Sequence, residues 1–446
     1  MGKNIQNPRG TVDILPNEIK KLEVIENYLK EFSMLYGYNE IRTPIFEDTS
    51  VFKRENDSSD MVNKEMYTFT INNKDYLTLR PEGTASVIRS IVQNKLYAKE
   101  ELPLKLSYYG PMFRYERPQK GRQRQFHQFG IENVGLKNPL IDAETIIFGY
   151  SFLKAIGVDD VKVLINTLGD KESRDNYKTA LKEYFKPHLD TLCADCKRRY
   201  EQNPLRILDC KVDKEHEAIT NAISLHDYLN DSSREYFEQV LSALDNLDIP
   251  YTIDSKLVRG LDYYSDTVFE IVSTNKESGS QATIIAGGRY DNLVEYYNGP
   301  SLSGIGFAMG MERLMILIDA LNIDLGIEES IDAYVMSLGD VKDMPLNIAT
   351  ALRANGFTVS MNYEKRSLKS QFKSVDRSNA KVAIIVGEQE LEDGQVVVKN
   401  LIDKTQNNIN LDDLVLHLDH IINQNEENHS CGCNDSECHC QGGKHE

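Results

Sequence analysis

The sequence lacks tryptophan altogether, has only seven cysteines among 446 residues, and contains no apolar run that approaches the length of a membrane span. Its first eight residues are polar and include no signal-peptide core. These absences exclude a membrane-spanning protein and a disulfide-stapled secreted one, so we expect a cytoplasmic chain whose cysteines are thiols or metal ligands. The length allows two to four domains with cores of their own.

Positive charge is scarce as well: 51 Lys and Arg stand against 69 Asp and Glu, a formal net charge of -18. This balance argues against indiscriminate nucleic-acid binding, because phosphates must be neutralised by cations. It leaves room for a nucleic acid held by local basic patches. One patch within a dozen residues has Glu116 as its only acid. Its five cations are Arg114, Arg117, Lys120, Arg122 and Arg124.

Two apolar, aromatic-rich stretches flank this basic patch, at residues 104–109 and 126–131. A proline and a glycine interrupt the run between them, which predicts two strands joined by a long hairpin loop. Such a hairpin would hold Arg114 on a strand, where it suits a small bound phosphate, and leave Arg122 and Arg124 on a mobile tip for a larger anion. The alternative is a solvated, salt-bridged loop, as most charge runs are.

The turn at residues 79–85 combines the carboxylate of Glu82 and the hydroxyl of Thr84 with the free N–H groups expected at a helix start near Ser86. This set could hold a small zwitterion, with its ammonium on the acid. The alternative is a capping glutamate and a threonine in the first turn of the helix, which these residues taken alone favour.

Residues 257–271 have strand composition and include the adjacent Tyr263 and Tyr264. Alternation along a strand would send the two rings to opposite faces. Tyrosine hydroxyls could hydrogen-bond a buried polar ring, with plain core packing as the alternative.

Two glycine-containing stretches follow. Residues 284–291 predict a strand that meets Gly287 and Gly288, where backbone or ligand must approach closely. Residues 303–314 alternate small and apolar residues and then open a helix whose first turn carries Arg313. A cation beside glycines at a helix start favours a bound anion.

Regular elements are predicted at several other places in the first half of the chain. Helical spacing begins after Asn17, a candidate cap, and a strand at residues 40–46 is broken by Pro44. A helix is predicted at residues 142–155 and a strand at residues 162–166.

The second half predicts a helical insertion at about residues 170–250, a polar linker at 322–330 and a compact α/β domain after it. In that domain, strands are predicted at 331–338, 382–386 and 396–399, and helices at 346–355 and 368–378. A second basic patch lies on or near the last helix: Lys365, Arg366, Lys369, Lys373, Arg377 and Lys381.

The cysteines fall into two groups. Cys193, Cys196 and Cys210 lie in the insertion without a clear fourth ligand, which favours free thiols over a structural zinc. A polar tail, residues 423–446, holds the other four and three histidines, which favours a soft metal ion, although no zinc is assigned there. The tail cysteines are Cys431, Cys433, Cys438 and Cys440.

Five segments, in this order along the chain, resemble the class II aminoacyl-tRNA synthetases, and specifically the histidine-tRNA ligase family. They are residues 78–85, 110–132, 257–264, 286–291 and 304–313. The second and the last resemble class II motifs two and three, while residues 79–84 and 259–264 resemble stretches peculiar to the histidine enzymes. The resemblance runs from about Arg9 to Leu418.

The resemblance implies an α+β fold: a six- or seven-stranded antiparallel catalytic sheet flanked by helices, with the helical insertion and a C-terminal α/β anticodon-binding domain. It places the catalytic domain at 1–325, the anticodon-binding domain at 330–420 and the tail at 423–446. It also implies a homodimer, with motif one around Glu40–Phe46 at the interface. No Rossmann fingerprint is expected or found.

The implied reaction is the ATP-dependent ligation of L-histidine to its tRNA through a histidyl-adenylate, in translation. The histidine carboxylate attacks the α-phosphate, so the site must stabilise negative charge and needs no general base. By resemblance Arg114 and Arg259 are catalytic at the α-phosphate, and Arg122 and Arg313 bind ATP, with Mg²⁺ bridging phosphates. No protein ligands to a metal are assigned in this site.

The resemblance also assigns histidine binding. The residues implied for the α-amino end are Glu82, Thr84 and Gln128, and those for the imidazole are Glu132, Tyr263, Tyr264 and Tyr290. Gly83, Arg114 and Arg259 complete the set. The hairpin loop, with Arg117, Gln119, Arg122 and Arg124, would meet the acceptor end of the tRNA. The alternative function is a non-catalytic, histidine-sensing regulatory paralogue, which typically lacks the anticodon-binding domain.

Overall fold

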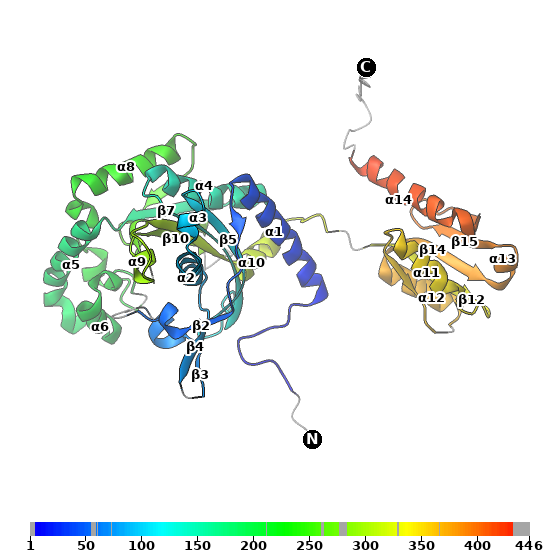
Figure 1. Cartoon of the computed structure of the whole chain (residues 1–446), viewed down its shortest axis with the longest axis horizontal. Helices are drawn as coiled ribbons and strands as arrows, with labels where there is room; N and C mark the ends of the chain where they lie inside the picture. The colour runs from blue at the N-terminus through cyan, green and yellow to red at the C-terminus, as the bar shows by residue number, and fades with distance from the viewer. Residues whose placement is uncertain are drawn as a thin grey trace, which may run out of the picture. The chain divides into compact units, whose positions relative to one another are not determined.

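The computed structural model describes residues 5–54, 59, 61–72, 74–210, 212–259, 263–275, 283–327, 330–364 and 366–430 (Figure 1). The chain divides into two compact units, Met1–Leu325 and Gly326–Glu446. Residues 260–262, Lys365 and the four tail cysteines lie outside the described residues.

The first unit is built around a sheet that has eight strands within the described residues. In sheet order they are β1 (Asn39–Glu40), β5 (Leu104–Phe113), β6 (Gln125–Val134), β11 (Gly304–Gly310), β10 (Thr283–Tyr290), β9 (Ser265–Ser273), β7 (Val161–Thr167) and β8 (Tyr251–Ile253). The six central strands pair antiparallel. At the two edges of the sheet, β1 pairs parallel with β5 and β8 pairs parallel with β7. The six antiparallel strands agree with the six or seven that the resemblance implies, and the short parallel strands β1 and β8 at the edges were not expected.

Helices cover both faces of this sheet. The adjacent Val268 and Phe269 of β9 point to opposite faces and belong to separate buried clusters. On the Phe269 side pack α1 (Pro16–Leu35), α4 (Pro139–Ala155), α8 (Asp231–Asp245) and α10 (Met311–Leu321). On the Val268 side pack α2 (Thr84–Asn94) and α9 (Leu293–Tyr296). The short helices α3 (Leu96–Lys99), η1 (Thr49–Val51) and η2 (Met61–Glu65) complete this part.

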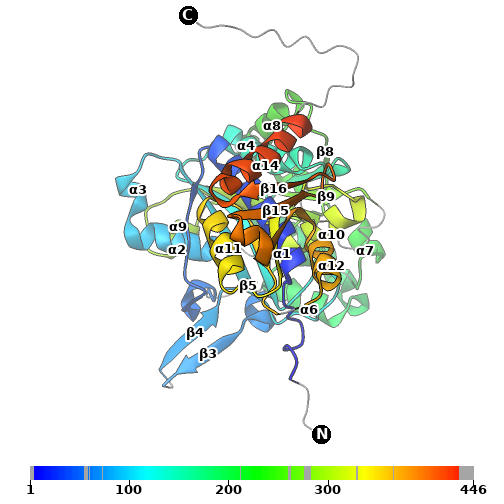
Figure 2. The ribbon, with the colours of Figure 1, turned by 90° about the vertical axis from the view of Figure 1, so that its right-hand side faces the viewer.

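The start of the chain corrects one prediction and confirms another. α1 begins at Pro16 with Leu15 as its N-cap, so Asn17 is inside the helix and is not the cap. Proline is favoured at a first helical position because its missing N–H would have no intrahelical partner there. Pro44 lies between β1 and β2 (Phe46–Asp48), as the broken strand predicted. β2 joins β4 (Asp75–Leu79) and β3 (Thr68–Ile71), and Figure 2 shows β3 and β4 side by side as a projecting ribbon.

The segment predicted as a helical insertion is helical, but much of it consists of short pieces. It contains α5 (Lys171–Phe185), η3 (Lys186–Thr191), α6 (Ala194–Gln202), η4 (Pro204–Ile207), α7 (Glu217–Thr220), η5 (Leu225–Tyr228) and then α8. Tyr177, Leu181 and Phe185 of α5 anchor a small separate core that also buries Cys196 and Cys210.

The second unit is the predicted α/β domain. Its sheet order is β13 (Val359–Met361), β12 (Ile331–Leu338), β14 (Ala380–Gly387), β15 (Gln395–Asn400) and β16 (Gln406–Asn410). Its helices are α11 (Met344–Ala354), α12 (Leu368–Ser378), α13 (Glu388–Glu392), η7 (Leu411–Asp413) and α14 (Leu414–Ser430). Two strands were not predicted from the sequence: β13, which is short, and β16, which is almost entirely polar. Among the described helices, none is both long and apolar enough to cross a membrane.

Candidate active site

A cavity of about 290 Å³ in the first unit gathers residues from the β5–β6 hairpin, β9, β10, β11 and the start of α10. Ten of the predicted site residues line it: Glu82, Thr84, Arg114, Arg122, Gln128, Arg259, Tyr263, Tyr264, Tyr290 and Arg313. Of the other two, Glu132 contacts Thr84 and Tyr290, and Gly83 packs against the Tyr108 ring. Segments more than 200 residues apart therefore meet in one site, because the central strands bring them together.

Arg114 lies at the end of the predicted hairpin, where hydrogen bonds of its backbone and its side chain hold it in place. It directly follows β5, and its N–H donates to the Arg124 carbonyl at 2.9 Å, which extends the pairing by one step. Its side-chain Nε donates to the Pro81 carbonyl at 2.8 Å, and its guanidinium lies 5.3 Å from the centre of the Phe126 ring. These contacts leave Nη1 near Glu116, at 3.7 Å from Oε1.

Arg259 is held by an acid that sequence analysis missed. Its Nη1 lies 2.5 Å from Oε1 of Glu270, whose other oxygen accepts from the Thr283 hydroxyl at 2.8 Å. The guanidinium also lies 5.5 Å from the centre of the Tyr264 ring. A single carboxylate inside the apolar run of β9 was the signal that could have identified Glu270.

Arg313 brings the third guanidinium from the first turn of α10. Its Nη1 donates to the Thr283 carbonyl at 3.0 Å and its Nε to the Gly121 carbonyl at 3.4 Å. Burial lowers the pKa of Arg313, and Arg122 and Arg114 lower that pKa further, against the raising effect of Glu116. Arg114, Arg122 and Arg313 therefore repel one another, and a bound anion would relieve this repulsion.

Glu132 is the most deeply buried acid of the site, with no exposed surface. It accepts hydrogen bonds from the Thr84 hydroxyl at 2.6 Å and the Tyr290 hydroxyl at 2.5 Å. Burial raises its pKa to about 8, against the lowering effect of those two hydrogen bonds. A glycine makes room for it: a Cβ on Gly306 would lie 2.1 Å from Glu132 Oε2.

Glu82 caps the start of α2, which was the alternative to binding a small zwitterion, and its side chain also lines the cavity. Its Oε1 accepts from the N–H of Ala85 at 2.9 Å, in the first turn of α2. α2 begins at Thr84 rather than near Ser86, so both polar residues lie at the helix start. Burial raises the pKa of Glu82, and the hydrogen bond from Ala85 and the charges of Arg54 and Arg114 lower it in part.

The two adjacent tyrosines do not point to opposite faces, so that prediction was wrong. β9 begins only at Ser265, and strand alternation does not apply to the residues before it. Tyr263 and Tyr264 both line the cavity, with ring centres 4.7 Å apart, and Tyr263 packs edge-on against Tyr290 at 5.9 Å. Arg174 of the insertion donates to the Tyr264 carbonyl at 2.6 Å.

A buried ion pair lies next to Tyr290 and was not predicted. Arg289 has no exposed surface, and its Nε donates to Asp142 of α4 at 3.0 and 3.1 Å. Its Nη1 also contacts the Ser303 hydroxyl. Because successive residues of β10 face opposite ways, this pair secures the strand from the side opposite Tyr290.

The hairpin loop differs from the prediction at Arg122, which is half-buried, lines the cavity and lies 3.4 Å from Glu116 Oε2, and at Arg124. The Arg124 guanidinium stacks 3.8 Å from the centre of the Tyr115 ring, and its Nε donates to the Glu116 carbonyl at 3.2 Å. Its N–H donates to the Gly10 carbonyl at 2.7 Å. Arg124 is therefore tied to the N-terminal segment and is not on a free tip, whereas Arg117 and Lys120 are exposed.

Both units match known families. The family profile described as histidyl-tRNA synthetase matches residues 10–314, and the one described as anticodon binding domain matches residues 332–419.

Individual proteins match over almost the whole chain. The histidine–tRNA ligase of Bacillus licheniformis is 49% identical over 420 residues, which cover 94% of this chain and 99% of that protein. That of Bacillus subtilis is 46% identical over 429 residues, covering 96% and 100%. The crystal structure of apo S. aureus histidyl-tRNA synthetase superposes with a TM-score of 0.80 at 42% identity, covering 93% of this chain and 99% of that one. With both units matched and these identities spanning the chain, the protein belongs to the histidyl-tRNA synthetase family.

Proposed function

We propose that this chain activates L-histidine with ATP in the cavity described above and then transfers it to histidine tRNA. The observation that carries the proposal is a set of cavity-lining polar atoms that have no hydrogen-bond partner among the described residues. They are Gln128 Oε1, Arg122 Nε and Arg259 Nε, each buried. One acceptor and two cationic donors suit a ligand that carries an ammonium group and phosphates.

Charge development explains why arginines would dominate the catalysis. A carboxylate that attacks a phosphorus atom brings one anion to another, and negative charge grows on the phosphoryl oxygens. Arg114 and Arg259 would align and neutralise these groups at the α-phosphate, while Arg122 and Arg313 bind the rest of the triphosphate. The nucleophile is already ionised, so no side chain needs to remove a proton.

Magnesium fits the donor set of the cavity. Carboxylates are the protein ligands that this ion uses together with substrate phosphates, and Glu116, Glu270 and Glu312 all line the site. When bound, Mg²⁺ would neutralise phosphate charge. The arginines and these acids would share the task of holding ATP.

Histidine would be recognised by the buried polar side chains of the cavity. Glu132 with Tyr263, Tyr264 and Tyr290 would hydrogen-bond the imidazole, and Glu82, Gly83, Thr84 and Gln128 would surround the α-amino group. Amino acids without two ring nitrogens would leave buried groups unpaired, and such mismatches are rejected by about 10⁴–10⁵-fold without editing.

ATP–pyrophosphate exchange tests this proposal. Purified protein should exchange labelled pyrophosphate into ATP only when histidine is present. Absence of exchange from a folded, histidine-binding protein would instead favour the regulatory paralogue. The match of residues 332–419 to an anticodon binding domain argues against that alternative.

We extend the proposal to assembly and location. The chain would act as a homodimer through Glu40–Phe46, with a catalytic domain at 1–325 and an anticodon-binding domain at 330–420. Its work in translation places it in the cytoplasm.

Replacing Glu132 by glutamine should change how histidine binding depends on pH. Burial holds the pKa of Glu132 at about 8, so the free enzyme carries that proton at pH 7 and loses it above pH 8. We expect the protonated carboxyl to donate to the unprotonated nitrogen of a neutral imidazole, a hydrogen bond that is lost when Glu132 ionises. We therefore expect the KM for histidine to rise above pH 8 by up to about tenfold per pH unit in the wild type.

The Glu132→Gln variant should have a higher KM at pH 7 but should lack this extra rise, because the amide keeps its N–H. The measurement is the histidine KM in exchange from pH 6.5 to 9.5, with Glu392→Gln on the exposed face of α13 as the control. Parallel pH curves for wild type and Glu132→Gln would contradict the role given to this carboxyl.

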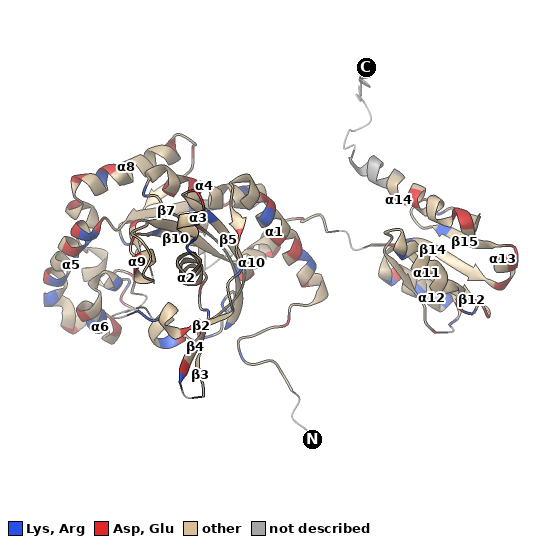
Figure 3. Cartoon of the chain, viewed as in Figure 1, with Lys and Arg blue, Asp and Glu red and all other residues tan. Residues whose placement is uncertain are grey.

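Replacing Lys369 and Lys373 by alanine should weaken tRNA binding without affecting exchange. Both side chains are exposed and lie one helical turn apart on α12, and Figure 3 marks basic residues on this helix in an otherwise acidic chain. Loss of two phosphate contacts should reduce the slope of log K against log salt by about 1 to 2.

Binding of histidine tRNA measured over a range of salt concentrations checks this expectation. The Lys369→Arg/Lys373→Arg variant preserves charge and should behave like the wild type. An unchanged salt slope in the alanine variant would place the tRNA contacts elsewhere.

A further inference from the structure

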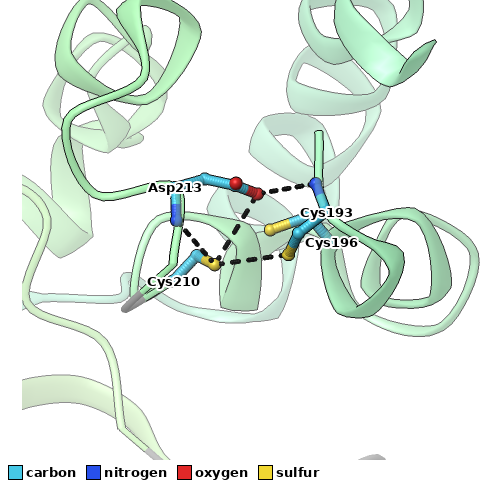
Figure 4. A group of neighbouring side chains, drawn as sticks. All are labelled: Cys193, Cys196, Cys210 and Asp213. Carbon is cyan, nitrogen blue, oxygen red and sulfur yellow. Dashed lines mark hydrogen bonds between the residues drawn. The ribbon is translucent and has the colours of Figure 1, made fainter. Parts of the chain in front are cut away.

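Four potential metal ligands converge in the insertion, outside the cavity. The thiols of Cys193, Cys196 and Cys210 and a carboxylate oxygen of Asp213 all lie within 4.8 Å of one another (Figure 4). Cys196 and Cys210 are buried, and Cys193 and Asp213 are half-buried.

The spacing of the donor atoms suits a tetrahedral ion. Cys193 Sγ lies 3.7 Å from Cys210 Sγ, and Cys210 Sγ lies 3.8 Å from Asp213 Oδ2. With Zn–S near 2.3 Å and Zn–O near 2.1 Å, a tetrahedron has edges of about 3.8 Å between sulfurs and about 3.6 Å between sulfur and oxygen. An ion could therefore sit among these donors with little movement of the backbone.

Backbone amides already support the negative charge of such ligands. The N–H of Cys193 donates to Asp213 Oδ2 at 2.9 Å, and the N–H of Asp213 donates to Cys210 Sγ at 3.4 Å. Hydrogen bonds of this kind orient ligands and favour the charged forms that bind metal.

The surrounding structure gives a physical reason for a cross-link. Cys193 is the N-cap of α6 and Cys196 is in its first turn, whereas Cys210 and Asp213 follow η4. From Lys186 to Tyr228 the described helices are mostly of four to six residues, and the core beneath them is small. Small cores of this kind are commonly stapled by a metal or disulfides, and disulfides are disfavoured in a reducing compartment.

We propose that Cys193, Cys196, Cys210 and Asp213 bind one zinc-class divalent ion in a closed, structural site. Free thiols were favoured from the sequence because no fourth ligand was clear, and Asp213 supplies that ligand. Four protein donors leave no open position for substrate, so the ion holds the insertion together and takes no part in adenylate formation.

The test uses the full-length chain with Cys431, Cys433, Cys438 and Cys440 replaced by serine, because the tail could itself bind metal. Elemental analysis after dialysis should find about one zinc per chain. Substitution with Co²⁺ should give the charge-transfer and ligand-field bands of a tetrahedral thiolate site. A metal-free protein that takes up neither ion, or mass spectrometry showing a Cys193–Cys210 disulfide, would overturn the proposal.

Variants in the same background test the ligands. Cys210→Ser and Asp213→Asn should each lose most of the zinc, weaken the cobalt bands and lower the Tm. As a control, Asp195→Asn should retain the metal. It removes an acid of α6 that pairs with Arg198 but is not one of the four proposed ligands. If Cys210→Ser fails to fold, cobalt titration of the parent chain still decides the question. Full zinc retention by both ligand variants would reject the assignment.

Discussion

Replacing Arg259 by alanine is expected to slow histidyl-adenylate formation about 10²–10³-fold, with a much smaller change in the KM for histidine. The guanidinium lines the cavity and is balanced by Glu270, 2.5 Å away. Its effect should be largest in the transition state, where charge accumulates on the phosphoryl oxygens, so kcat should fall more than binding weakens.

The measurement is histidine- and ATP-dependent pyrophosphate exchange at saturating and limiting substrate. Because the variant leaves Glu270 without its cation, Tm and calorimetric histidine binding must be measured alongside, to separate folding from catalysis. Arg353→Ala removes an arginine from α11 in the other unit and should leave exchange unchanged. A loss confined to KM would show that Arg259 binds substrate equally in the ground and transition states.

Replacing Arg289 by methionine is expected to lower the free energy of unfolding by about 3–5 kcal/mol, because Asp142 would keep a buried charge with no cation. The pair is fully buried and joins β10 to α4 across 147 residues of chain. The same change should raise the KM for histidine, since Tyr290 directly follows Arg289 and reaches Glu132.

Urea unfolding at one fixed protein concentration measures the effect. The double variant Asp142→Leu/Arg289→Met is the informative comparison, because replacing both charges by apolar groups removes the unpaired charge. It should recover a large part of the lost stability. A double variant no more stable than Arg289→Met would mean that the pair is not the source of the effect.

Local secondary structure was predicted well where a sequence pattern repeats within a few residues. The β5–β6 hairpin, the helix that carries Arg313 and the α/β domain all follow from apolar periodicity and turn residues. The predictions failed where no such pattern exists. Short parallel edge strands have too few residues to alternate, and Tyr263 and Tyr264 precede the strand whose alternation was applied to them.

Contacts between distant residues could not be obtained from local patterns. The joint placement of Arg114, Arg259 and Arg313 came from a family resemblance, since nothing in their spacing brings them together. Neither the Arg289–Asp142 pair nor the acid that balances Arg259 was recognised. Asp213 was overlooked as a neighbour of the thiols because aspartate is common and only its position in space distinguishes it.

The glycine at 306 limits how this site could evolve. Its missing side chain is the space that Glu132 occupies, so any larger residue there collides with the carboxylate. Under the role proposed for Glu132, a lineage could not gain a side chain at position 306 without displacing the carboxylate that selects the substrate.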